Sequence, residues 1–179
     1  ASGAANSAIF NGAQPKYTVQ WNESHDTYCE GSSSYVSDTN LKKTWAIVGS
    51  RAEVCGMYLA RPGSGSTMLG NADTTAWADK EVKAVNQFKN AFVGQSEYFA
   101  SSGSIAYVER GTSGVVLVNM GGSSTSVSVT ANKMASGTYI DQISGNTFTV
   151  SNGKISGNIG STGIAVVYNA DEIEIPTQA

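Results

Sequence analysis

The stretch SIAYVERGTSGVVLVNM, Ser104 to Met120, decides the fold of the second half of the chain. It holds two short runs rich in Val and Ile on either side of a turn of Gly, Thr and Ser. Five similar runs follow at a spacing near ten residues, separated by Gly, Ser and Asn: TSVSVT, GTYIDQI, NTFTV, GKISGNI and GIAVVY. Short, partly alternating strands at this spacing predict an antiparallel Greek-key β-sandwich over residues 96–170.

Upstream of this region, residues 1–95 show a different pattern. Residues 1–16 are small and polar and predict a connecting loop. YTVQW, Tyr17 to Trp21, predicts a buried strand, and GMYLARPG, residues 56–63, predicts a second short apolar strand. The acidic residues 171–179, at the other end of the chain, read as a linker-like tail.

Two amphipathic helices are expected after these strands. The first covers about residues 39–51 and can be capped by Ser37 and Asp38; the second covers about residues 80–92, with Gly94 placed as a C-terminal cap. Alternation of strand and helix predicts parallel βα units, but two units cannot close a sheet. The predicted fold class is therefore α/β plus all-β, with part of the α/β layer missing.

Composition excludes several classes of protein. The chain has 11 Lys and Arg against 14 Asp and Glu, with no basic run, so we expect no nucleic-acid partner. No apolar run is long enough to span a bilayer, so we expect no membrane partner. Low charge with abundant Ser, Thr, Gly and Asn is typical of secreted bacterial proteins, and we expect an extracellular location.

One stretch carries candidate chemistry: WNESHDTYCEG, Trp21 to Gly31, which contains the only histidine, His25, followed by Asp26. Taken alone, such a pair is more often a helix cap or a hydrogen-bonded loop pair than a site. A triad of Ser24 with this pair is not expected, because adjacent residues in a strand point to opposite faces and Asp26 could hardly orient His25.

The series of motifs around this pair resembles the α-amylase family of glycoside hydrolases. Trp21 to Tyr28 is similar to the family's strand-seven motif, LKKTWAIVGSRA to the next helix and MYLARPGS to strand eight. VKAVNQFKNAFVGQ is similar to the last barrel helix, and ERGTSGVVLVNMGG to the opening of domain C. The resemblance implies the last two βα units of a (β/α)8 barrel in residues 1–95 and domain C in residues 96–170.

The resemblance also implies roles for individual residues. In such barrels the active site lies at the carboxyl ends of the strands. Asp26 would be the third catalytic carboxylate, which stabilises the transition state of a retaining reaction. His25 would donate to a sugar hydroxyl, and Tyr28 and Arg61 would bind substrate. For Tyr28, packing over its own loop is an equally open alternative. For Arg61, an ordinary ion pair is the better alternative.

The family's nucleophile and acid lie on earlier strands that are not in this chain. We therefore expect the C-terminal part of a secreted bacterial α-amylase that cleaves α-1,4-glucosidic bonds of starch and maltooligosaccharides. The chain would be inactive without its missing N-terminal part, which could be held non-covalently. The resemblance implies calcium in the whole enzyme, at a site mostly outside this chain, and no metal ligand within it.

Two other functions compete with this one. The sandwich could be a non-catalytic module that binds polysaccharide through exposed aromatic residues, and two such residues on one face would favour that function. Aromatic residues buried between the sheets would count against it. The sandwich could also be purely structural, which is compatible with the enzyme function. Cys29 and Cys55 are placed at opposite ends of the predicted strands, so no disulfide is expected.

Overall fold

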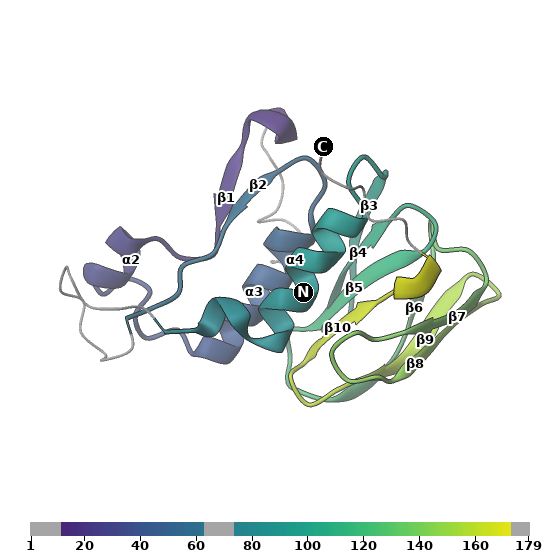
Figure 1. Cartoon of the computed structure of the whole chain (residues 1–179). Helices are drawn as coiled ribbons and strands as arrows, with labels where there is room; N and C mark the ends of the chain where they lie inside the picture. The colour runs from purple at the N-terminus through teal and green to yellow at the C-terminus, as the bar shows by residue number, and fades with distance from the viewer. Residues whose placement is uncertain (1–11, 63–73, 173–179) are drawn as a thin grey trace.

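The computed structural model describes residues 12–62 and 74–172, and it consists of three stacked layers and a small flanking sheet (Figure 1). Helices α3 (Asp38–Ser50) and α4 (Lys80–Ala91) form the first layer. The second layer is a sheet of order β10-β5-β4-β3, and the third a sheet of order β6-β9-β8-β7. The predicted tail, 171–179, and the start of the predicted first domain, 1–11, lie largely or wholly outside the described residues.

The inner sheet is antiparallel and is covered on both faces. Its strands are β3 (Glu97–Ser102), β4 (Ile105–Arg110), β5 (Gly114–Asn119) and β10 (Ile164–Val167). Every residue of β4 and β5 is buried, because one face packs on the helices and the other on the outer sheet. This explains the continuous apolar run GVVLV, which a strand exposed on one face would not need.

The outer sheet has one buried face and one exposed face. Its strands are β6 (Thr125–Thr130), β7 (Gly137–Ile140), β8 (Thr147–Ser151) and β9 (Lys154–Ile159), all antiparallel. Strand β6 pairs with β9 rather than with β7, which is a Greek-key order. The antiparallel sandwich predicted from the turn spacing is thus present; its first strand, β3, was missed.

The two long helices agree with the sequence prediction within a residue. Ser37 caps α3 by accepting from the backbone N–H of Asn40. Helix α4 ends at Ala91, and Gly94 follows with a φ of +75°, a conformation that glycine adopts without strain. Trp45 and Phe88 are buried in the core between the helices and the inner sheet, as their helical spacing predicts.

The small sheet pairs β1 (Val19–Trp21) with β2 (Cys55–Met57) in parallel, with α3 between them along the chain. The prediction of a buried strand over Tyr17 to Trp21 is wrong in two respects. Pro15–Tyr17 form a turn of 3-10 helix, and Val19 and Trp21 are about half exposed. Only one face of this two-stranded sheet has a partner, namely α3, and no further described strand covers the other.

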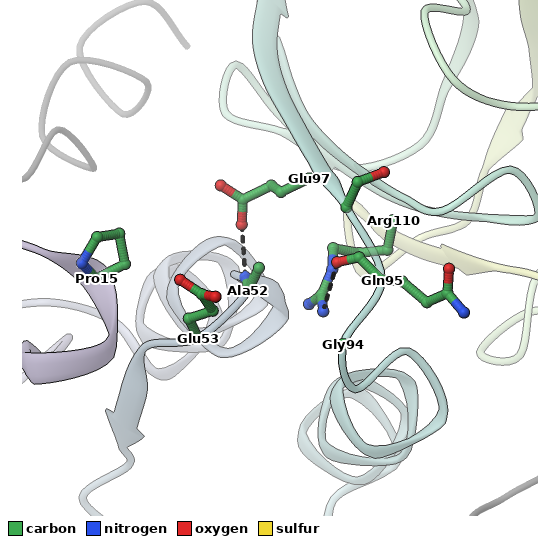
Figure 2. Close-up of a pocket in the computed structure, with 8 residues that line it drawn as sticks. Pro15, Ala52, Glu53, Gly94, Gln95, Glu97 and Arg110 are labelled. Carbon is green, nitrogen blue, oxygen red and sulfur yellow. Dashed lines mark hydrogen bonds between the residues drawn. The ribbon is translucent and has the colours of Figure 1, made fainter.

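Two buried arginines, Arg51 and Arg110, connect the helices to the inner sheet in a region that we call the joint. Figure 2 shows Arg110 there, with Glu97 and Ala52 nearby. Arg110, on β4, donates to the carbonyl oxygens of Ser50 and Phe92 at 2.9 and 2.6 Å, near the ends of α3 and α4. Arg51 forms an ion pair with Glu97 at 2.9 Å, and Glu97 also accepts from the backbone N–H of Ala52. Cations at helix carboxyl ends are favoured by both hydrogen bonding and the helix dipole.

No helix in the described part of the chain is both long and apolar enough to cross a bilayer.

Candidate functional site

His25 and Asp26 begin a short helix, α2 (His25–Cys29), that directly follows β1. Ser24 caps it: its hydroxyl accepts from the backbone N–H of Thr27, and the Thr27 hydroxyl accepts from the backbone N–H of Ser24. The sequence did not predict this helix, because five residues are too few to show an amphipathic period.

The helix brings the side chains of His25 and Asp26 together, with Nε2 of the histidine 3.0 Å from Oδ1 of the aspartate. The sequence argument that they point to opposite faces assumed a strand and is wrong, because neighbouring residues in the first turn of a helix can reach each other. Their side chains are 78% and 70% exposed, so both remain open to a bound molecule. A carboxylate and an imidazole side by side can accept and donate hydrogen bonds to one polar ligand.

The pair lies at the carboxyl end of β1, on the part of the molecule that projects away from the sandwich (Figure 1). Since β2 runs parallel to β1, the residues that follow β2 reach the same end of the small sheet. Arg61 is one of these residues. The two segments therefore meet at one edge, as the predicted βα units require.

Arg61 is occupied by contacts within the chain rather than open to a ligand. Its Nε and one terminal nitrogen each donate to Glu23 at 2.7 Å, and its guanidinium also donates to the carbonyl oxygens of Ser33 and Val36. The Glu23 side chain is fully buried. The hydrogen bonds that Arg61 donates to Glu23 hold the pKa of Arg61 above its ordinary value. This is the ion pair that the sequence left open as the alternative for Arg61.

Tyr28 lies beneath the same guanidinium. The Arg61 carbon is 5.0 Å from the centroid of the Tyr28 ring, and Tyr28 is 8% exposed. Of the four predicted site residues, His25 and Asp26 are thus exposed, whereas Tyr28 and Arg61 pack under the loop that follows α2. Glu23, which lies within the strand-seven motif from Trp21 to Tyr28, and Ser33 complete this cluster; Ser33 carried no recognisable signal in the sequence.

A hollow of about 310 Å³ lies at the joint between helices and sandwich, beside Glu53, Glu97 and Arg110 (Figure 2). Arg51 and the Ala52 N–H donate to Glu97, and two nitrogens of Arg110 donate to backbone carbonyls. Since Glu97 and Arg110 are engaged in contacts that connect helices and sheet, we regard the hollow as a structural feature rather than the candidate site.

The aromatic residues of the sandwich are mostly internal. Tyr107, Tyr139, Phe148 and Tyr168 are at most 6% exposed, and Tyr98 and Phe99 are partly buried. This counts against a binding surface built from exposed aromatic residues on the sandwich. Trp77, which precedes α4, is 58% exposed, and Tyr35, which follows α2, is 82% exposed.

Within residues 12–62 and 74–172, no three or more His, Cys, Asp or Glu side chains gather closely enough to hold a metal ion. Cys29 ends α2 and Cys55 begins β2; no disulfide joins these two exposed residues.

Comparison with known proteins identifies relatives along almost the whole chain. An α-amylase of Clostridium acetobutylicum is 31% identical over 183 residues, an alignment that covers 97% of this chain and 23% of the relative. The chain is related to the α-amylases. A second α-amylase, from Butyrivibrio fibrisolvens, is 29% identical and is matched over 87% of this chain and 18% of its own length. The chain therefore corresponds to a C-terminal part of an α-amylase, as the sequence predicts, and spans about a fifth of these relatives.

Solved α-amylases share the fold. The wild-type α-amylase I of Eisenia fetida matches with a TM-score of 0.66 at 14% identity, over 92% of this chain and 44% of that protein. A mutant of the same enzyme, solved as a maltohexaose complex, matches with a TM-score of 0.55 at 14% identity, over 72% of this chain and 35% of that one. No protein-family model matches the chain.

Proposed function

We propose that this chain supplies the third catalytic carboxylate, Asp26, of a retaining α-amylase that hydrolyses α-1,4-glucosidic bonds in starch-like glucans. The observation that carries the proposal is the relationship to the α-amylase of Clostridium acetobutylicum along 97% of the chain. The exposure of His25 and Asp26 at the carboxyl end of β1 supports it, because barrel enzymes place their chemistry at that end of the strands.

The two side chains suit different parts of this reaction. Glycosidic cleavage passes through an oxocarbenium-like transition state, in which positive charge develops on the sugar ring. The Asp26 carboxylate would accept hydrogen bonds from ring hydroxyls and oppose that charge. The imidazole of His25 would donate to a hydroxyl of the same sugar, and it lies against Asp26, so the two groups are within reach of one ligand.

The nucleophile and the acid of a retaining reaction are two further carboxyl groups. We propose that both belong to the N-terminal part of the same enzyme, and that the 179-residue chain alone does not hydrolyse glucan. The half-exposed apolar side chains of Val19, Trp21 and Met57, on one face of the small sheet, would then pack inside a barrel completed by that part. Residues 12–95 would supply its last two βα units.

Substrate, cofactor and location follow from the same relationship. The Eisenia fetida relative was solved with maltohexaose, which supports starch and maltooligosaccharides as ligands here. As the family resemblance implies, the whole enzyme would bind calcium at a site mostly outside this chain. The low charge and high Ser, Thr and Gly content fit an extracellular enzyme.

The experiment is a matched pair of substitutions in the longer α-amylase that contains this chain. Asp26→Asn keeps the shape of the side chain and removes its charge, and we expect kcat on soluble starch to fall at least a hundredfold. Glu30→Gln makes the same change at another exposed carboxylate, at the end of α2, and should leave kcat within twofold. Equal activity of Asp26→Asn and wild type would refute the assignment.

A structural role for the sandwich is supported independently by the joint at Arg110 and by the shared core of the helices and the inner sheet. We propose that the sandwich stabilises the barrel by holding the carboxyl ends of α3 and α4. This role accompanies the catalytic one.

A further inference from the structure

Several hydrogen bonds hold the loop between α2 and α3 to its surroundings. Ser33 donates its backbone N–H to the carbonyl oxygen of Thr27 at 3.0 Å and its hydroxyl to Glu23 at 2.6 Å. Arg61 donates to the carbonyl oxygens of Ser33 and Val36 at 3.0 and 2.8 Å. The segment between those two carbonyls is therefore fixed at both ends.

That fixed segment carries Tyr35, whose ring is not part of the packing. Tyr35 is 82% exposed, the largest exposed fraction among the large hydrophobic residues that the structure describes. An exposed Tyr is ordinary in a protein. Here, however, Arg61 holds the backbone on both sides of Tyr35. Arg61 is itself paired with the buried Glu23, and the desolvation of such an ion pair is expensive. The arrangement fixes the backbone from which the aromatic ring projects and leaves the ring exposed.

The backbone that carries Tyr35 is joined by a hydrogen bond to the helix of the proposed catalytic pair. Thr27, whose carbonyl oxygen accepts from Ser33, is the residue next to Asp26. From standard backbone dimensions, the Cα atoms of Asp26 and Tyr35 are at most roughly 18 Å apart, a span of a few sugar rings. Both belong to the segment that projects from the carboxyl end of β1 (Figure 1).

We propose that Tyr35 is a sugar-stacking residue, on which a glucose ring of a bound α-glucan packs within a few sugar units of the reacting sugar, and that Arg61 is the positioning residue that holds the Tyr35 backbone there. A sugar ring offers an apolar face of C–H groups, which an aromatic ring covers while its hydroxyl stays in water. This inference rests on the proposed function, and it gives Arg61 a role through Tyr35 in place of direct substrate contact.

The test compares two exposed tyrosines in the longer α-amylase that contains this chain. Tyr35→Ala should raise KM for a long maltooligosaccharide about three- to tenfold, the usual size of one aromatic contact, with kcat within twofold. Tyr35→Phe keeps the ring and should match wild type. Tyr17→Ala is the matched control, because Tyr17 is 78% exposed but precedes β1, at the opposite end of that strand.

Arg61→Lys tests the positioning role, since Lys keeps the charge but its single nitrogen cannot reproduce the four hydrogen bonds that three guanidinium nitrogens donate. If Arg61 acts through Tyr35, Arg61→Lys raises KM in the wild-type background but adds nothing in the Tyr35→Ala background. Additive effects of the two substitutions would overturn that role.

The stacking proposal fails if Tyr35→Ala leaves KM unchanged, or if Tyr17→Ala raises it equally. Those results differ from failure of the proposed function, in which Asp26→Asn would hydrolyse starch as fast as wild type.

Discussion

Replacement of Arg110 by Met tests the joint between the helices and the sandwich. Arg110 is 2% exposed, and its two short hydrogen bonds end on the carbonyl oxygens of Ser50 and Phe92, with a longer third one to the carbonyl oxygen of Gln95 at 3.5 Å. A hydrogen bond from a charged donor contributes about 1.5–3 kcal/mol, so loss of two removes roughly 3–6 kcal/mol. Burial lowers the pKa of Arg110, which reflects the desolvation that Met would avoid; this relief offsets about half of the loss. We expect Arg110→Met to lower the free energy of unfolding by about 1.5–3 kcal/mol.

The assay is urea unfolding followed by tryptophan fluorescence, to which the buried Trp45 on α3 contributes. Lys154→Met is the control, because Lys154 is an exposed cation on the outer sheet and its loss should change stability by less than about 0.5 kcal/mol. A loss below about 0.5 kcal/mol for Arg110→Met would refute the argument, since it would mean that the two bonds only balance the desolvation of the guanidinium.

Two other predictions concern the core and the pH dependence of stability. A Cβ on Gly114 would overlap the rings of Phe92 and Phe88, so Gly114→Ala should cost about 1–3 kcal/mol in urea unfolding, whereas Gly122→Ala meets nothing nearer than 3.7 Å and should be close to neutral. Burial lowers the pKa of Lys43 below its ordinary 10.5, so above its folded pKa the unfolded chain binds more protons than the folded one. The free energy of unfolding should therefore rise with pH in the alkaline range below 10.5, and unfolding curves of Lys43→Met should show a smaller rise; an unchanged slope would contradict this sign.

The elements that the sequence predicted well are those set by neighbours along the chain. Helix α3 follows from the spacing of Leu41, Trp45 and Val48 and from a Ser at its cap, all within a few residues of one another. The sandwich strands follow from turn residues that recur at short intervals. Periods of this kind depend on local backbone geometry, so they are visible before any tertiary contact forms.

The sequence predicted the site only in part, because most contacts of the site join residues that are not neighbours along the chain. The adjacency of His25 and Asp26 is a property of the sequence, but their contact depends on α2, a helix too short to show a period. The contacts of Arg61 join residues 23, 33, 36 and 61, and no local pattern marks such a cluster.

The sequence by itself determined the two long helices, most strands and the position of the α/β part before the β-sandwich. Through resemblance, it also indicated the relationship to the α-amylases. Tertiary structure alone decided which faces are buried and which side chains remain open to a ligand. Strands β4 and β5 are covered on both faces because α3 and α4 pack on a sheet that a simple sandwich would leave exposed. Arg61 is sequestered and Tyr35 exposed because burial depends on segments far apart in the chain, and a linear pattern carries no record of which of them meet.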